Sequence, residues 1–179
     1  MLDRHVVLIG FMGSGKSTVG PLLARRIGVP FVDLDQYIVR QTGRPIPEIF
    51  AAEGESGFRT RESDALREIL TQPPLVLAAG GGVIERVENR QMLRDQALCV
   101  WLRVPIEVVL ERVGNDPNRP LLQNDPGFVR TRRLYAAREP LYAEADIHID
   151  ATRSPEETVE TIVAALRVRR AGQTGCGNG

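Results

Sequence analysis

The chain has 179 residues, of which 42% are apolar and 26% are charged. This length and composition are typical of one globular domain. The formal net charge is zero, so the overall charge indicates neither a nucleic acid nor an anionic membrane as a partner. Cys99 and Cys176 lie far apart in the sequence, which predicts neither a disulfide framework nor a metal site and favours a reducing cytoplasm. No stretch of the sequence reaches the length of a membrane span.

Short apolar runs alternate with helix-like segments along the chain. We expect five strands, which cover residues 5–9, 31–34, 75–79, 98–102 and 147–149. We expect helices between them, which cover residues 16–27, 36–41, 45–52, 55–70, 87–95, 105–113 and 128–139. Gly28, Gly43 and Gly54 are predicted to end or separate helices. A final helix is predicted to begin after Ser154, because this capping residue is followed by Pro155 and two glutamates.

This alternation predicts the fold class. Continuous apolar strands between helices are typical of a parallel sheet that is buried between two helical layers. We therefore expect a three-layer α/β/α domain that covers residues 1–170. The segment 115–125 is rich in Asn, Asp and Pro and has the composition of a mobile loop. The segment 171–179 contains four glycines and is predicted to be a disordered tail.

The first predicted strand leads into a glycine-rich segment, Gly10–Ser17, with the sequence Gly-Phe-Met-Gly-Ser-Gly-Lys-Ser. This is a complete G-x-x-x-x-G-K-[ST] P-loop, in which backbone N–H groups surround phosphates and the lysine reaches the β- and γ-phosphates. Lys16 is the single lysine among 23 cationic side chains, and a compact ammonium suits this position better than a planar guanidinium. The motif predicts a bound nucleoside triphosphate. A plain glycine-rich turn is the alternative.

Two carboxylates, Asp33 and Asp35, lie at the end of the second predicted strand. Residues two apart on a strand point to the same side, so both can face a crevice at the carboxyl edge of the sheet. In P-loop enzymes a carboxylate near this edge and the loop hydroxyl, here Ser17, hold magnesium. We expect Asp33 to supply that carboxylate and Asp35 to accept the proton of a substrate hydroxyl. The alternative is an exposed pair that caps the following helix.

Three glycines, Gly80, Gly81 and Gly82, directly follow the third predicted strand. Consecutive glycines cost conformational entropy, which favours a function in which their N–H groups approach a polar ligand closely. A simple tight turn is the alternative. The strand ends without the acid of an ordinary Walker B segment, so the carboxylate for a metal must come from elsewhere in the chain, as Asp33 can provide.

Three arginines stand in informative contexts. Arg59 and Glu62 are one helical turn apart, so the glutamate can orient the guanidinium, although the same spacing is routine in surface ion pairs. Arg119 lies in the predicted mobile loop, from which it can swing over a transferring phosphoryl group and stabilise its charge. Arg138 is predicted to end a helix, where a cation also serves as a simple cap.

Taken in chain order, these motifs resemble those of the shikimate kinase family along nearly the whole sequence. The matching segments are Gly10–Ser17, Asp33-x-Asp35, Gly57-Phe58-Arg59-x-x-Glu62, Gly80–Gly82, Arg119-Pro-Leu-Leu and Arg138-x-Pro-Leu-Tyr142. The P-loop alone is shared by a vast superfamily, whereas the later motifs together are far more specific. The resemblance implies a P-loop kinase fold of the nucleoside-monophosphate-kinase type, with a five-stranded parallel sheet and a mobile lid at about 115–125.

The resemblance also implies a reaction and its acceptor site. The family transfers the γ-phosphoryl group of ATP to the 3-hydroxyl of shikimate, in the route to chorismate and the aromatic amino acids. Asp35 would orient that hydroxyl and accept its proton. The other contacts to shikimate would come from Arg59, Gly80, Gly81, Gly82 and Arg138, with the two arginines on the carboxylate, which suits their bidentate geometry.

On the nucleotide side the resemblance implies a cradle for the ATP phosphates, formed by Gly13, Ser14, Gly15, Lys16, Ser17 and Thr18. Ser17 and Asp33 would hold Mg²⁺, the implied cofactor. Arg119 would close over the γ-phosphate, which makes it the third implied catalytic residue beside Asp35 and Lys16. Arg112 and Arg153 would lie on the adenine side.

Other functions fit the sequence less well. A different small-molecule kinase of the same architecture, such as a gluconate kinase, is the alternative: a neutral polyol would still need Asp35, and a gluconate-type acid would need only its own carboxylate clamp. Adenylate-type kinases recognise a phosphate and a base on the acceptor. The N-K-x-D guanine motif of GTPases needs a second lysine, which the sequence lacks. A catalytically inactive ATP-binding module would be expected to lack Asp35 or Arg119, and both are present. We expect a cytoplasmic, monomeric enzyme with ATP and shikimate as its ligands and no nucleic-acid or membrane partner.

Overall fold

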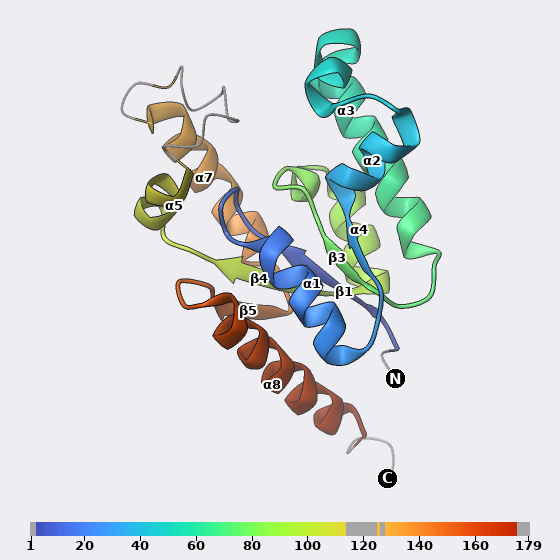
Figure 1. Cartoon of the computed structure of the whole chain (residues 1–179), viewed down its shortest axis with the longest axis vertical. Coiled ribbons are helices and arrows are strands. Elements are labelled where there is room, and N and C mark those ends of the chain that lie inside the picture. The colour runs from blue at the N-terminus through green and yellow to red at the C-terminus, as the bar shows by residue number, and fades with distance from the viewer. Residues whose placement is uncertain (1–2, 114–124, 126–127, 175–179) are drawn as a thin grey trace.

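The computed structural model describes residues 3–113, 125 and 128–174. Five strands form one sheet in the order β2-β3-β1-β4-β5, and each pair of neighbours is parallel (Figure 1). The strands are β1 (His5–Ile9), β2 (Phe31–Asp33), β3 (Val76–Ala78), β4 (Ala97–Arg103) and β5 (Ile147–Asp150). The predicted five-stranded parallel sheet is confirmed.

Helices lie on both faces of this sheet. They are α1 (Lys16–Ile27), α2 (Leu34–Thr42), α3 (Ile46–Leu70), the 3₁₀ turn η1 (Val83–Glu85), α4 (Val87–Gln96), α5 (Ile106–Val113), α7 (Val129–Tyr142) and α8 (Pro155–Thr174). Helices α1 and α8 pack against each other, and α4 packs against β4 and η1. In Figure 1, α2 and α3 stand on one side of the start of α1, and α5 and α7 stand on the other side.

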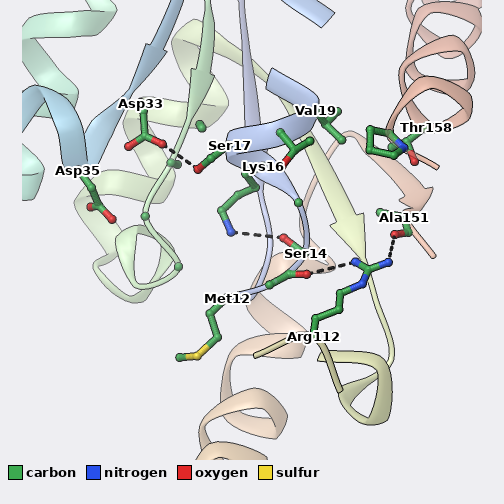
Figure 2. Close-up of a pocket in the computed structure, with 18 of the residues that line it drawn as sticks. Met12, Ser14, Lys16, Ser17, Val19, Asp33, Asp35, Arg112, Ala151 and Thr158 are labelled. Carbon is green, nitrogen blue, oxygen red and sulfur yellow. Dashed lines mark hydrogen bonds between the residues drawn. The ribbon is translucent and has the colours of Figure 1, made fainter. Parts of the chain in front are cut away.

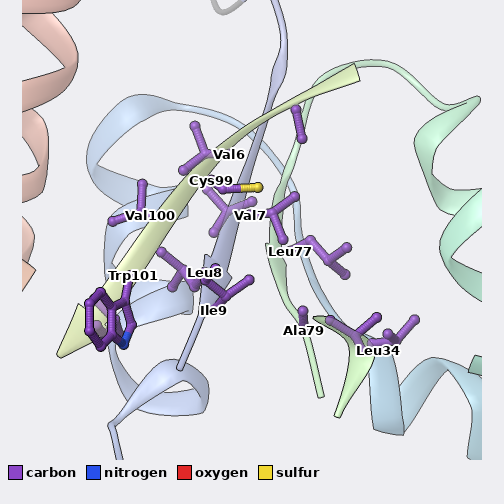
Figure 3. Close-up of a cluster of buried hydrophobic side chains, with 14 of the residues drawn as sticks. Val6, Val7, Leu8, Ile9, Leu34, Leu77, Ala79, Cys99, Val100 and Trp101 are labelled. Carbon is purple, nitrogen blue, oxygen red and sulfur yellow. The ribbon is translucent and has the colours of Figure 1, made fainter. Parts of the chain in front are cut away.

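The core is centred on β1, the middle strand of the sheet. Val6, Val7 and Leu8 are fully buried, as are Val100 and Leu102 of the neighbouring β4. Figure 3 shows the side chains of β1, β3 and β4 gathered around this central strand. Because the strands are apolar on both faces, the sheet needs a helical layer on each side. Parallel strands also bring all their carboxyl ends to one edge of the sheet, where ligands bind in such folds.

The observed element boundaries can be compared with the predicted ones at the end of β2 and at Gly54. Strand β2 ends at Asp33 rather than Leu34, because the Asp33 carboxylate accepts a hydrogen bond of 3.2 Å from the backbone N–H of Gln36 and so caps α2. The predicted break between two helices at Gly54 is confirmed: α3 is interrupted at Gly54, where φ is 69° and ψ is −179°. A left-handed φ of this kind favours glycine.

The predicted lid at 115–125 and the predicted tail at 171–179 lie partly outside the described residues. Of the predicted lid at 115–125 the structure describes Asp125, whose carboxylate accepts from the backbone N–H groups of Arg130 and Thr131 at 2.9 and 2.8 Å and so caps α7. Helix α8 continues through Thr174, so the predicted tail at 171–179 begins with helix rather than disorder. The helix ladder continues there because each added residue gains a backbone hydrogen bond. No helix among the described residues is long and apolar enough to cross a membrane.

Candidate active site

The P-loop connects the end of β1 to the start of α1, and its shape depends on glycine. Gly10 has a φ of 148°, and a Cβ there would lie 2.8 Å from the carbonyl oxygen of Leu102. Gly15 precedes α1 with a φ of 93°, in the region that other residues rarely adopt. The loop thus leads into the N-terminus of α1, where unpaired N–H groups and the helix dipole favour an anion.

Lys16 lies over this loop. Its Nζ donates to the carbonyl oxygens of Gly10 and Phe11 at 2.7 and 2.9 Å and to Oγ of Ser14 at 3.3 Å. Figure 2 shows the ammonium group beside the loop, on the side that faces Asp35. A short, flexible cation held by main-chain oxygens is suited to reach the phosphates of a ligand in the loop.

A cavity of about 600 Å³ opens beside the P-loop. This volume is in the range of small-molecule and cofactor sites. Its P-loop wall contains all six predicted phosphate-binding residues, Gly13–Thr18. The remaining walls are formed by Met12, Val19, Asp33, Asp35, Ala78, Ala79, Gly80, Gly81, Arg112, Ala151, Arg153, Pro155 and Thr158. Residues from five separate parts of the sequence therefore meet at the carboxyl edge of the sheet.

Asp33 and Ser17 are joined at one wall of this cavity. Oγ of Ser17 donates to Oδ2 of Asp33 at 2.9 Å (Figure 2). Because the other oxygen of Asp33 caps α2, this carboxylate has a fixed orientation. Hydroxyl and carboxylate oxygens are ligands that Mg²⁺ accepts. The described residues contain no cluster of three or more His, Cys, Asp or Glu that could hold a metal, so a metal here would need oxygens from the nucleotide and water as well.

Asp35 reaches the cavity by a different route from the predicted one. The prediction that both carboxylates lie on one strand is wrong because β2 ends at Asp33. Asp35 lies in the first turn of α2 and still lines the cavity. Burial and the charge of Asp33 raise the pKa of Asp35, while the charges of Lys16 and Arg59 oppose that rise. A carboxyl group with a raised pKa is a better acceptor for a substrate proton at neutral pH.

The three glycines after β3 leave room for charged side chains. A Cβ on Gly80 would lie 2.6 Å from Oε1 of Glu62, and a Cβ on Gly82 would overlap the guanidinium of Arg59. Gly82 has an ordinary φ of −95°, so the need for glycine at this position comes from space rather than from backbone conformation. Because Gly80 and Gly81 also line the cavity, the charged groups packed behind the triplet adjoin the cavity wall.

Those charged groups form a compact cluster, Arg59, Glu62, Glu85 and Arg138. Nη1 of Arg59 donates to Glu62 at 2.9 Å, so the predicted orienting contact is confirmed. The side chain of Glu62 is 1% exposed, and burial raises its pKa against the opposing charge and hydrogen bond of Arg59. Nε of Arg138 donates to Oε1 of Glu85 at 3.0 Å.

Arg138 does not end its helix. Helix α7 continues past Pro140 to Tyr142, so the interpretation of Arg138 as a C-terminal cap is wrong. Its side chain is buried and turns toward the glycine triplet, where a Cβ on Gly81 would lie 3.4 Å from Nη1. Tyr142 supports the same segment, because its hydroxyl donates to the carbonyl oxygen of Gly81 at 2.6 Å.

The far end of the cavity holds the two arginines that were assigned to adenine. Arg112 donates to the carbonyl oxygens of Gly13 and Ala151, both at 3.2 Å, and thereby joins α5 to the P-loop and to the loop after β5 (Figure 2). Arg153 lines the same end. Arg119 lies outside the described residues.

Several residues of the site carry no signal in the sequence. Glu85 has no motif around it, and its contacts with Arg138 and Arg59 in the folded chain indicate its role. Ala151, Pro155 and Thr158 line the nucleotide end of the cavity, but they carry no catalytic group that a sequence pattern could reveal. They belong to the site because the strand order puts β5 beside β4.

A P-loop at the end of a central parallel strand, with a hydroxyl–carboxylate pair and a second carboxylate beside it, defines the class as a P-loop phosphotransferase. The family model for shikimate kinase matches residues 12–167, which is most of the chain. The chain belongs to the shikimate kinase family.

Individual relatives agree with this assignment. The shikimate kinase of Synechococcus elongatus is 45% identical over 161 residues, which are 89% of this chain and 84% of the relative. That of Nitrosomonas europaea is 45% identical over 168 residues, 93% of this chain and 80% of the relative. Both alignments run through nearly the full length of the described domain.

Solved structures give the same result. A shikimate kinase from Acinetobacter baumannii in complex with shikimate matches with a TM-score of 0.87 and 40% identity, over 93% of this chain and 94% of that one. The enzyme from Aquifex aeolicus matches with a TM-score of 0.85 and 35% identity, over 94% and 99%. A gluconokinase from Sinorhizobium meliloti, at 19% identity and a TM-score of 0.68 over 98% of both chains, shares the fold alone.

Proposed function

We propose that the protein transfers the γ-phosphoryl group of ATP to the 3-hydroxyl of shikimate, a step toward chorismate and the aromatic amino acids. The observation that carries this proposal is the arginine pair behind the glycine triplet. Arg59 and Arg138 adjoin the wall of a cavity that also contains the P-loop and Asp35. Guanidinium groups suit a planar carboxylate, and an acceptor with a carboxylate and a ring hydroxyl fits this arrangement.

The nucleotide would lie with its phosphates in the P-loop. The N–H groups at the start of α1 would bind phosphate oxygens, and Lys16 would reach the β- and γ-phosphates. Arg112 and Arg153 line the far end of the cavity, which supports their assignment to the adenine side. Arg119 keeps its proposed place over the γ-phosphate on the basis of the sequence motif.

Ser17 and Asp33 would hold Mg²⁺. Their oxygens lie 2.9 Å apart at the cavity wall, and a hard cation of this kind is bound by few protein ligands together with phosphate oxygens and water. When bound, the ion would neutralise the charge of the transferring phosphates. The identity of the metal as magnesium rests on the hard oxygen character of these two ligands.

Asp35 would orient the acceptor hydroxyl and take its proton. Its pKa is raised by burial and by Asp33, so the carboxylate can bind a proton more readily than an exposed aspartate. Arg59, held by Glu62, and Arg138 would bind the acceptor's carboxylate and place the hydroxyl. The glycine triplet would bring its backbone close to the acceptor ring.

The experiment that tests this proposal measures ADP release from the purified protein with ATP and Mg²⁺, with shikimate and gluconate offered separately. We expect turnover with shikimate and none above background with gluconate. Turnover with gluconate alone would refute the proposed acceptor. Arg59→Ala should raise the KM for shikimate by about 10- to 100-fold, as loss of a hydrogen bond to a charged group does. Arg67→Ala on the same helix, whose exposed side chain pairs with Asp64, is the matched control.

The remaining assignments extend this proposal. We propose that residues 1–170 act as one domain with a lid at about 115–125, and that the enzyme is a cytoplasmic monomer without a nucleic-acid or membrane partner. Size-exclusion chromatography with light scattering tests the monomer. Amide exchange in 115–125 should slow when ATP and shikimate are both bound if that segment closes as a lid.

A further inference from the structure

Glu85 contacts both arginines that are assigned to the acceptor's carboxylate. It is the last residue of η1, three residues after the glycine triplet. Its Oε1 accepts from Nε of Arg138 at 3.0 Å, and its Oε2 lies 3.8 Å from Nη2 of Arg59. One carboxylate of the chain itself therefore spans the two guanidiniums, as the proposed substrate carboxylate would.

The acidic partners of the two arginines differ in how firmly they are held. Glu62 lies on α3, one turn from Arg59, and its side chain is 1% exposed. Glu85 lies on a three-residue turn, and its side chain is 35% exposed. Glu55 is mostly exposed and reaches Arg59 alone, at 3.5 Å. A partly exposed carboxylate regains its hydration when it leaves an ion pair, whereas a buried one does not. Glu85 is the partner that contacts both guanidiniums and can also move away.

The charge of Glu85 affects how strongly Arg59 and Arg138 can bind another carboxylate. Three carboxylates, those of Glu55, Glu62 and Glu85, lie within 4 Å of the two guanidiniums, so the charges of Arg59 and Arg138 are already matched. A further carboxylate that arrives with the acceptor meets a cluster with no excess positive charge, and like charges at this distance repel each other. The cluster binds that carboxylate more strongly when the charge of Glu85 is absent.

We propose that Glu85 is an internal competitor for the acceptor's carboxylate: it occupies Arg59 and Arg138 and must yield them when the acceptor binds. This inference rests on the proposed function for the identity of the acceptor. Glu85 thereby sets the affinity for the carboxylate without taking part in phosphoryl transfer. It also keeps two like-charged, largely buried guanidiniums paired in the free enzyme.

The first test is Glu85→Gln, which retains the shape and the oxygen acceptor but removes the charge. We expect the KM for shikimate to fall by about three- to tenfold, as expected for one charge removed near a partly exposed ion pair. The kcat and the KM for ATP should stay within about twofold of the wild type, because the ion pairs of Glu85 are with Arg59 and Arg138 rather than with the P-loop lysine. Glu85→Asp, which retains the charge, should stay close to the wild type in all three constants.

Two controls separate charge competition from a general effect. Glu88→Gln makes the same change three residues later, at an exposed side chain that lies 3.8 Å from Arg86 rather than beside the arginine pair, and it should leave the KM for shikimate unchanged. Methyl shikimate carries no carboxylate charge, so its KM should be the same for the wild type and Glu85→Gln. An unchanged or raised KM for shikimate in Glu85→Gln would overturn the proposal, and a raised value would make Glu85 a positioning residue for the arginines.

A binding measurement tests the competition by Glu85 independently of whether shikimate is the substrate. Cyclohex-1-enecarboxylate has the ring and the carboxylate but no hydroxyl to phosphorylate, and calorimetric titration measures its binding without turnover. We expect Glu85→Gln to bind it about three- to tenfold more tightly than the wild type. If shikimate is not phosphorylated and this tightening is still seen, the proposed acceptor is wrong and the competition stands. Equal binding by the two proteins would overturn the competition whatever the substrate.

Discussion

The hydroxyl of Tyr142 contributes both to the stability of the fold and to the acceptor site. Tyr142→Phe removes this hydroxyl and leaves the ring, so it measures both contributions. Tyr142 is 2% exposed, and its ring stacks on Trp101 with the centroids 6.1 Å apart. The substitution retains this ring and removes the hydroxyl, and with it the 2.6 Å hydrogen bond to the carbonyl oxygen of Gly81 and the interaction with the side chain of Arg138. Because Gly81 lines the cavity, water can reach the released carbonyl, so the cost stays near that of a single net hydrogen bond.

The expected magnitude follows from these contacts. One net hydrogen bond contributes about 1 kcal/mol, which corresponds to a fall in Tm of about 2–4 °C for a domain of this size. The Gly81 backbone should also be held less firmly at the acceptor site. We expect the KM for shikimate to rise by about two- to fivefold, or roughly 0.4–1 kcal/mol, with the KM for ATP unchanged.

The assay compares Tyr142→Phe with Tyr135→Phe. Tyr135 lies on the same helix, and its hydroxyl also donates to a backbone carbonyl, that of Val104 at 3.0 Å. Thermal unfolding by circular dichroism should show a similar loss of stability in both variants, whereas only Tyr142→Phe should raise the KM for shikimate. The reasoning is refuted if Tyr142→Phe leaves both the Tm and the KM at wild-type values, or if Tyr135→Phe raises that KM equally.

Further expectations concern the catalytic carboxylate, the glycine triplet and the buried thiol. Asp35→Asn should lower kcat by about 10²- to 10⁴-fold with ATP affinity retained. Because burial raises the pKa of Asp35, the kcat/KM of the wild type should fall as the pH drops through that raised pKa. The same pH profile in the Asp35→Asn variant would exclude Asp35 as the proton acceptor. Gly82→Ala places a methyl group on the Arg59 guanidinium, so the KM for shikimate should rise while circular dichroism stays native; an unchanged KM would show that Arg59 adapts freely. Burial raises the pKa of Cys99 to about 12, so this thiol should resist alkylation at neutral pH until the protein unfolds, as mass spectrometry of the modified peptide can show.

Most of the fold could be predicted from the sequence because its signals are local. An apolar run such as His5–Ile9 forms a strand that is buried on both faces, and the glycine-rich segment after it forms a P-loop for steric reasons. Boundaries were harder to predict. Strand β2 ends at Asp33 rather than Leu34 because the Asp33 carboxylate accepts a hydrogen bond from the backbone N–H of Gln36 and caps α2, and the sequence pattern allowed either boundary.

The amino-acid sequence alone shows which chemical groups are present and the order in which they occur: a P-loop with its lysine, two carboxylates, a glycine triplet and several arginines. These groups are recognisable because their spacing within one segment is constrained by phosphate binding or by a helical turn. The contact between Arg59 and Glu62 is of this kind, since four neighbouring residues on a helix suffice to predict it.

Which of these groups meet depends on how the chain folds. Arg138 and Glu85 are 53 residues apart in the chain, and no local pattern relates a helix residue to a turn that follows another strand. They come together because α7 packs against η1, and the glycines between β3 and η1 leave space for the guanidiniums. Long-range packing of this kind depends on the whole core, so the charge balance of the acceptor site, and with it the proposed competition by Glu85, is visible only in the folded chain.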